Sequence, residues 1–142
     1  WWTPQYLIPL VGMILGNALT GVSLGLDRIL ASFDEGRDRV ECRLAMGATS
    51  WEASRPEAAE AIRTGMIPIL NAMSAVGLIT IPGMMTGQIL GGTPPEVAAR
   101  YQIMIMFLIA GAVAFGVSIA VLLTTRLMFD SNHRLRRTEV AR

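Results

Sequence analysis

The sequence predicts an all-α, polytopic helical membrane protein, and two observations lead to this fold class. The 142 residues are 52% hydrophobic and have a mean hydropathy of +0.47, which is too apolar for an ordinary soluble domain. The apolar residues form three long stretches, and the segments between and after them hold nearly all of the charge. We therefore expect three transmembrane helices, a cytoplasmic helical hairpin, and a segment that proline and glycine break.

The first predicted span covers residues 6–26, close to the ~20 residues that a helix needs to cross a bilayer. Trp1 and Trp2 precede it, as expected for aromatic rings at a membrane interface. Glycines four residues apart allow another helix to approach closely, and Asn17 offers a hydrogen bond to that helix or to a substrate. The two pairs are Gly12 with Gly16 and Gly21 with Gly25.

Residues 27–63 are predicted to form a helical hairpin in water, because they carry six arginines and eight acidic residues. Capping boxes that begin at Ser32 and Thr49 predict two helix starts, and Ser54, two residues before a proline, predicts a third. Gly47 is placed to end the first helix. The hairpin should therefore consist of a helix, a tight turn and a second helix.

The second predicted span covers residues 64–90 and contains the least regular part of the chain. A proline and four glycines lie within residues 82–92. Proline removes a backbone donor, so we expect the helix to kink or stop near Ile81. Broken backbone at membrane depth is tolerated where it is buried in protein or lines a wet cavity. The segment therefore indicates a translocation path or, alternatively, a kinked helix end with glycines for close packing.

The third predicted span covers residues 102–125, and a capping box at Thr93 with a proline in the first helical position begins its helix. The tail, residues 126–142, carries five arginines, whereas the connection before this span carries only Arg100. Because cytoplasmic segments are rich in basic residues, we place the hairpin and the tail in the cytoplasm and the amino end outside.

Several kinds of chemistry are disfavoured by what the sequence lacks. Lysine is absent, so no Gly-Lys-Ser/Thr phosphate loop exists and any ATP must be hydrolysed on another chain. A single cysteine, Cys42, and a single histidine, His133, do not make a metal site. No carboxylate lies inside a predicted span, which disfavours an intramembrane enzyme. We expect a protein that is not an enzyme, has no cofactor and binds no nucleic acid.

The stretch from Glu41 to Trp51 resembles the conserved cytoplasmic loop of ABC-transporter permeases, which docks on the ATP-binding subunit. Cys42 and Arg43 stand where that loop usually has two alanines, and the proline that usually follows lies further on, at Pro68. The alternative is a solvated hairpin with no partner. The resemblance assigns contact with the ATPase to Glu41, Gly47, Ala48, Thr49, Trp51 and Glu52.

Four ordered motifs together resemble the FetB-type (YbbM-like) permease family, which contains bacterial iron-export permeases and plant proteins linked to aluminium tolerance. The motifs lie at residues 1–10, 12–17, 82–90 and 100–103. Family members are longer and have more spans, so the chain corresponds to the carboxyl half of a permease. The resemblance implies a multi-pass protein of the bacterial inner membrane that forms a homodimer, pairs with a separate ATP-binding subunit and exports iron.

Candidate residues for the substrate path carry amides, a hydroxyl or thioethers. Thioethers suit copper(I) better than ferric iron, and methionine is otherwise a flexible packing residue. Two further functions stay open: an importer-type permease for another metal or small solute, and a non-transporting membrane scaffold. The predicted path residues are Asn17, Asn71, Met84, Met85, Thr86 and Gln88.

Overall fold

The computed structural model describes residues 4–76, 79 and 81–129. The predicted interface residues Trp1 and Trp2 and the tail beyond residue 129 lie outside this part of the chain. Over the described residues the predicted all-α class is confirmed. The helices are α1 (Pro4–Glu35), α2 (Arg37–Ala45), α3 (Ser50–Ala75), α4 (Gly83–Leu90) and α5 (Pro95–Met128).

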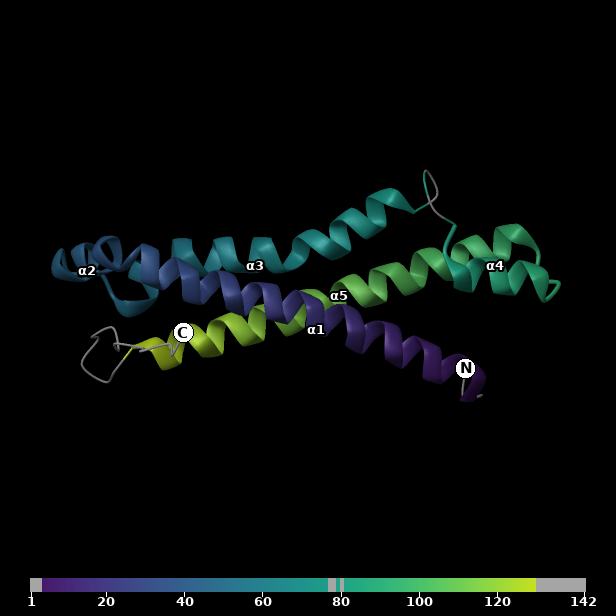
Figure 1. The fold of residues 1–142 in the computed structure, drawn as a ribbon, viewed down its shortest axis with the longest axis horizontal. Coiled ribbons are helices and arrows are strands. Elements are labelled where there is room, and N and C mark those ends of the chain that lie inside the picture. Colours follow the sequence, from purple (N-terminus) through teal and green to yellow (C-terminus); the bar gives the residue numbers. More distant parts are fainter. Residues whose placement is uncertain (1–3, 77–78, 80, 130–142) are drawn as a thin grey trace.

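The three long helices form an elongated bundle in which α1 and α5 run opposite to α3 (Figure 1). The α2 helix and the carboxyl end of α5 lie at one end of this bundle, which we call the hairpin end. The amino end of α1 and the short α4 helix lie at the other, the α4 end (Figure 1). The α4 helix packs on α5.

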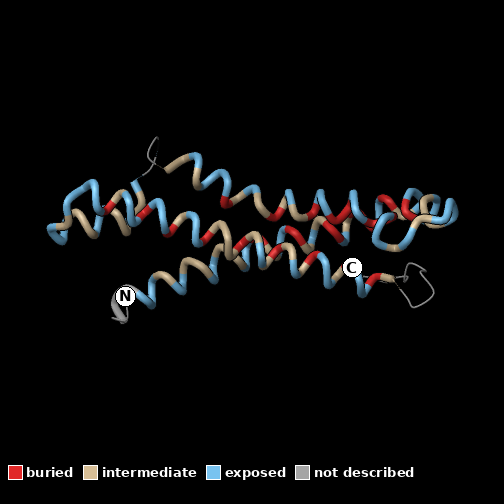
Figure 2. Tube along the Cα trace, turned by 180° about the vertical axis from the view of Figure 1, so that it is seen from behind, coloured by how far each residue is buried: buried red, intermediate tan, exposed pale blue. Residues whose placement is uncertain are grey.

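The buried core lies toward the hairpin end (Figure 2). The first buried residue described in α1 is Gly21, the last in α3 is Ile69, and α4 has none. The α5 helix contributes a stripe with three- or four-residue spacing, as expected for one helical face. This stripe includes Ile105, Ile109, Val113, Val117 and Val121.

The α1 and α3 helices touch through their backbones where Gly21 faces Gly65. A Cβ added to Gly65 would lie 2.7 Å from the Gly21 carbonyl oxygen and 2.7 Å from Val117 Cγ1. Only glycine fits there, so the close approach predicted at Gly21 is confirmed. At Gly12 and Gly16, a Cβ would meet nothing within 4 Å in the described part of the chain.

The α1 helix is longer than the first predicted span, because it continues to Glu35. The predicted capping box at Ser32 is wrong: Ser32 is inside the helix, and its carbonyl accepts a hydrogen bond from the Gly36 N–H at 2.9 Å. Ile29 and Phe33 are 0% and 1% exposed, so their burial extends the helix beyond the apolar stretch. The chain breaks only at Gly36, which caps α2.

The helix start predicted at Ser54 is also wrong, because α3 runs without interruption through Pro56 and Pro68. Ala53 and Ala58, on either side of Pro56, are both buried. Packing on both sides of the proline therefore outweighs its local preference for a helix start. The helix ends at Ala75, earlier than the stop predicted near Ile81.

The start of α5 agrees with the sequence in one respect only. A proline occupies the first helical position as predicted, but it is Pro95, one residue later than a cap at Thr93 requires, because Pro94 is the N-cap and makes no side-chain cap. The predicted capping box at Thr93 is therefore wrong. Within the described residues, two helical segments are long and apolar enough to cross a membrane, Leu7–Glu35 and Pro95–Met128.

Candidate functional site

The turn between α2 and α3 is built by residues that we predicted to contact an ATPase. Gly47 has a φ of +93°, which side chains rarely tolerate, and its N–H donates to the Leu44 carbonyl at 3.0 Å. The Glu52 N–H donates to the Thr49 hydroxyl at 3.3 Å, and the Thr49 N–H donates to the Glu52 carboxylate at 2.9 Å. The predicted stop at Gly47 and the capping box at Thr49 are therefore confirmed as local structure.

The capping box also changes the acidity of Glu52. The ionised carboxylate accepts hydrogen bonds from the backbone N–H of Thr49 and from its hydroxyl, at 2.9 and 2.8 Å. These bonds, the backbone one most, hold the pKa of Glu52 below its ordinary value because they stabilise the charged form.

A largely buried ion pair, absent from our prediction, fixes α2 against α3. Arg43 Nη1 donates to both carboxylate oxygens of Glu57 at 3.0 Å and to the Ala53 carbonyl at 2.7 Å. The Glu57 side chain is 7% exposed and that of Arg43 is 30% exposed. A buried carboxylate requires such partners, so the pair holds the hairpin in one geometry. The sequence contains a signal for this pair. Arg43 and Ala53 are equally far along the sequence from Ala48 in the turn, so a hairpin brings them side by side, and Glu57 lies one helical turn after Ala53.

The tip of the hairpin exposes apolar side chains to solvent. Trp51 is 52% exposed and Met46 is 76% exposed, while Ala48 is half-buried. Glu41 is also exposed and pairs with Arg37 at 2.8 Å on its own helix. Large apolar groups of this kind are what a protein partner can bury.

The six predicted path residues fall into three pairs. Met84 and Gln88 line one cavity. Asn17 and Thr86 instead donate hydrogen bonds to backbone carbonyls of the preceding helical turn, at 2.8 and 3.3 Å. The structure does not bring all six together. The two remaining residues are Asn71, which is exposed, and Met85, which is half-buried and outside the cavity lining.

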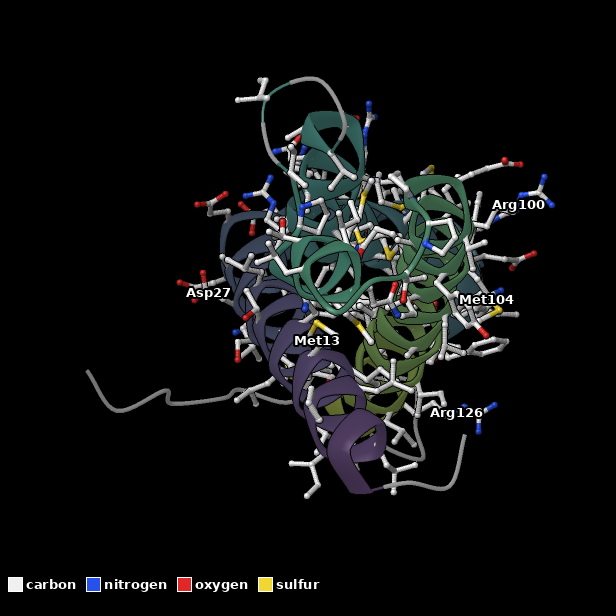
Figure 3. The ribbon with its side chains drawn as sticks, turned by 90° about the vertical axis from the view of Figure 1, so that its right-hand side faces the viewer. Met13, Asp27, Arg100, Met104 and Arg126 are labelled. Atoms are coloured by element: carbon white, nitrogen blue, oxygen red, sulfur yellow. The ribbon has the colours of Figure 1, made fainter. Side chains whose placement is uncertain are left out.

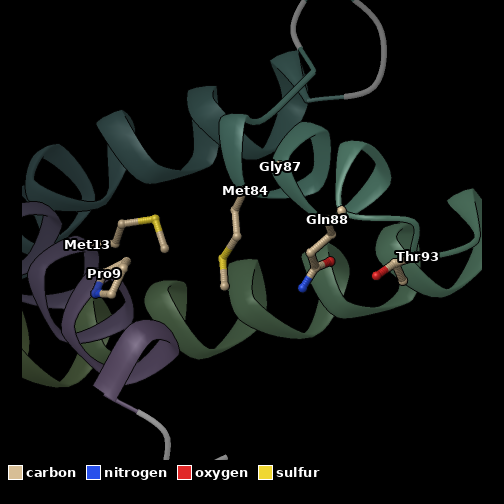
Figure 4. A pocket seen from close by; sticks show the side chains of 7 residues that line it. Pro9, Met13, Met84, Gly87, Gln88 and Thr93 are labelled. Atoms are coloured by element: carbon tan, nitrogen blue, oxygen red, sulfur yellow. The ribbon is translucent and has the colours of Figure 1, made fainter.

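The cavity has a volume of 430 Å³ and lies between the first half of α1 and α4. Met13 from α1 and Met84 from α4 extend their thioethers into it, and the Gln88 and Thr93 side chains follow along the same wall (Figure 4). Pro9 and two glycines complete the lining, which contains no charged side chain. Our prediction did not include Met13, because nothing local in the sequence places it opposite α4, or Thr93, which follows α4 in the turn to α5.

A buried amide lies about two turns into α5, the helix on which α4 packs. Gln102 is 7% exposed, and its Oε1 has no hydrogen-bond partner. A buried acceptor without a partner costs about 1–3 kcal/mol. This oxygen is therefore poised to accept a hydrogen bond or to contact a cation.

Ordinary metal-ligand clusters are absent from the described residues, where no three His, Cys, Asp or Glu side chains come together. In this part of the chain, the donors that converge on one space are thioethers, an amide and a hydroxyl. They suit soft or weakly held ions rather than hard multivalent ones.

Comparison with known proteins identifies relatives over nearly the whole chain. A UPF0014 membrane protein of Synechocystis sp. is 46% identical over 109 residues, which are 77% of this chain and 42% of that protein. "Probable iron export permease protein FetB" of Escherichia coli is 34% identical over 137 residues, 96% of this chain and 53% of that protein. "Protein ALUMINUM SENSITIVE 3" of Arabidopsis thaliana is 37% identical over 110 residues, 78% of this chain and 40% of that protein.

The chain spans about half the length of the curated relatives that it matches. No solved structure matches it. Residues 1–129 match the sequence model described as "Uncharacterised protein family (UPF0014)". The relatives include a bacterial protein named as a probable iron export permease and a plant protein named for aluminium sensitivity, the two kinds of protein that the motifs indicated. This membrane protein therefore belongs to the UPF0014 family.

Proposed function

We propose that the chain is the carboxyl half of the transmembrane permease subunit of an ABC transporter that exports iron. A relative that matches 96% of the chain is named "Probable iron export permease protein FetB", and two helical segments of the described residues are long and apolar enough to cross a membrane. In this proposal the chain supplies no catalytic group, and a separate ATP-binding subunit hydrolyses ATP.

The continuity of α3 is the observation that carries this proposal. The helix extends from Ser50 to Ala75, which is roughly 39 Å at 1.5 Å per residue. The Arg43–Glu57 pair fixes α2 to the first turns of this helix. A force on the exposed hairpin tip is therefore carried along one helix to the edge of the segment broken at Pro82.

The proposed topology has three spans, of which the second is discontinuous. Residues 64–75 of α3 reach roughly 18 Å, well short of the ~30 Å core of a bilayer. The α4 helix would complete the crossing, so the break between them lies at membrane depth. Discontinuous helices at that depth surround binding sites in transporters, and the cavity at Met84 and Gln88 lies beside this break.

The proposed orientation places the hairpin and the tail in the cytoplasm of a bacterial cell. The arginine-rich hairpin and the carboxyl end of α5 lie at the same end of the bundle, and the amino end of α1 lies at the other (Figure 1). Gly12 and Gly16 leave room for a helix of the amino half or of a second permease copy. Exposed apolar residues of α5, such as Phe107 and Phe115, face lipid or those helices.

Reconstitution tests the proposal directly. The full-length permease and its companion ATPase are placed in vesicles, and ATP-dependent movement of iron away from the ATPase side is measured. We expect Gly47→Pro to abolish transport and co-purification of the ATPase. Gly92→Pro is the matched control, because Gly92 also has a positive φ, +90°, and its N–H likewise donates to a carbonyl three residues back, at 3.0 Å, but at the α4 end.

Other outcomes point to the alternative functions. Movement of iron or another solute toward the ATPase side would indicate an importer. A bound ATPase with no transport, unaffected by changes at Gly83 or Gln88, would indicate a scaffold. Equal loss of ATPase binding in Gly47→Pro and Gly92→Pro would remove the coupling role from the hairpin.

A further inference from the structure

Two methionines that are far apart in the sequence share the cavity beside α4. Met13 belongs to α1 and Met84 to α4, and both extend their thioethers into the same 430 Å³ space (Figure 4). Met104 provides the contrast, because it is 44% exposed and points away from the bundle (Figure 3). The two cavity methionines therefore differ in setting from a methionine on the outer face.

The chemistry of this lining selects a particular kind of ion. Thioethers are soft ligands that bind copper(I) and similar ions well, whereas hard ions such as magnesium or ferric iron need carboxylate oxygens. The cavity has no charged side chain. Because the cost of desolvating an ion rises with the square of its charge, an uncharged cavity favours a singly charged ion over a divalent or trivalent one.

Two side chains with oxygen donors line the same cavity as the two sulfur atoms. Gln88 lies one helical turn after Met84 on α4, and Thr93 follows in the turn to α5, and both line the cavity. The unpartnered Oε1 of buried Gln102 lies on the helix against which α4 packs. A soft ion held by two thioethers can accept a neutral oxygen as a further ligand.

We propose that Met13 and Met84 bind a soft monovalent cation of the copper(I) or silver(I) class, with the Gln88 amide oxygen as a further ligand. The ligands come from two helices on separate parts of the chain, so a movement of α4 relative to α1 opens or closes the site. The proposal goes beyond iron export, and its test requires neither ATP nor transport.

The test measures silver(I) binding to the full-length protein in nanodiscs by calorimetry in chloride-free buffer. All variants carry Cys42→Ala, because the exposed thiol of Cys42 would also bind silver. We expect Met13→Leu and Met84→Leu each to weaken binding roughly tenfold or more. Met104→Leu should bind like the Cys42→Ala parent, and all three changes nearly conserve side-chain volume.

A second measurement needs no variant in the cavity. X-ray absorption of the copper(I)-loaded Cys42→Ala protein should show sulfur neighbours of the metal, and within these 142 residues the remaining sulfur atoms are all thioethers. Copper with only oxygen or nitrogen neighbours would overturn the proposal. It would equally fail if Met13→Leu and Met84→Leu bound silver as tightly as Met104→Leu, whatever the iron-transport assay shows.

Discussion

At Arg43 the chain departs from the alanine expected in the loop of ABC permeases, and the structure gives the arginine a role. Its guanidinium bridges the Ala53 carbonyl and the Glu57 carboxylate, which joins α2 to α3. Alanine could make neither contact. The hairpin of this chain is therefore held by a polar contact that depends on this residue.

We expect Arg43→Ala to lower the free energy of unfolding by about 2 kcal/mol, because Glu57 keeps a buried charge without its partner. The partial exposure of Arg43, 30%, lets water reach the carboxylate and moderates the loss. The measurement is the thermal unfolding midpoint of the purified protein, with hydrogen exchange of the α2 amides.

The matched control is Arg100→Ala, since Arg100 pairs with Glu96 at 78% and 77% exposure. It should change stability by no more than about 0.5 kcal/mol. Replacing both partners, Arg43→Met with Glu57→Leu, should recover most of the loss. Equal effects of Arg43→Ala and Arg100→Ala would contradict the conclusion that the Arg43–Glu57 pair fixes α2 against α3.

The lowered pKa of Glu52 predicts that the stability of the hairpin depends on pH. Its pKa is lowered in the folded protein from an ordinary value of 4.5, so its contribution to stability is present above that value and is lost as the pH falls through the lower folded pKa. We expect Glu52→Gln to destabilise the hairpin near neutral pH and to match the wild type in acid. Thermal midpoints of both proteins, compared from about pH 7 to about pH 3, check this; a constant difference would refute it.

The sequence predicts single residues well where the signal is local. Gly47 and Thr49 act as predicted because a positive φ and a capping box depend on neighbours within a few residues. The position of Met13 in the cavity lining and the unpartnered Oε1 of Gln102 could not be predicted, since both depend on which helices pack together. The chemistry of Met84 and Gln88 makes them candidates from the sequence alone, but only the structure shows that both line one cavity.

For whole elements, the errors lie where tertiary packing overrides a local signal. Asp27 marked the predicted end of the first span, yet burial of Ile29 and Phe33 carries α1 further. Pro56 suggested a helix start, but α3 continues through it because its neighbours are packed. Charge and proline mark where a helix can end, and the contacts with other helices decide whether it does.

We expect Gly65→Ala to destabilise the bundle by about 1–3 kcal/mol, the usual cost of overpacking. Its Cβ would lie 2.7 Å from a backbone oxygen of α1, and that atom cannot move without the helix. Gly111→Ala on α5 is the control, because nothing described lies within 4 Å of its added Cβ. Thermal unfolding compares the two.

A further variant separates the two contacts at this position. Val117→Ala combined with Gly65→Ala removes the clash with the valine but not the clash with the Gly21 carbonyl, so stability should recover only in part. Full recovery would show that the α1 and α3 backbones are not in the close contact described above.

At the scale of the molecule, composition and charge segregation were enough to predict a helical membrane protein. Composition and charge do not predict how the predicted second span is built. The α3 helix carries charge in its first half and ends at Ala75, so its apolar part alone is too short to cross a bilayer. Where the break lies in the bilayer depends on the partners of α3 and α4, and the chain spans only about half of its relatives.

The proposed orientation predicts which residues can be labelled from each side. In intact cells, a membrane-impermeant maleimide should not reach Cys42, the single cysteine of the chain, which is exposed on α2. It should reach the thiol in Cys42→Ala with Glu96→Cys, since the Glu96 side chain is 77% exposed at the α4 end. Inverted vesicles should give the reverse pattern, and labelling of Cys42 from outside would invert the topology.

The backbone contact between Gly21 and Gly65 makes α3 a lever with a fixed pivot. Gly65 divides the helix from Ser50 to Ala75 into arms of roughly 22 Å and 15 Å. A tilt about this contact that moves the hairpin away from α1 must bring the far end of α3 toward α1, by about two-thirds of the distance. Opening at the hairpin end and closing at the α4 end are then one movement, with the sign reversed and the amplitude reduced by the position of a single glycine.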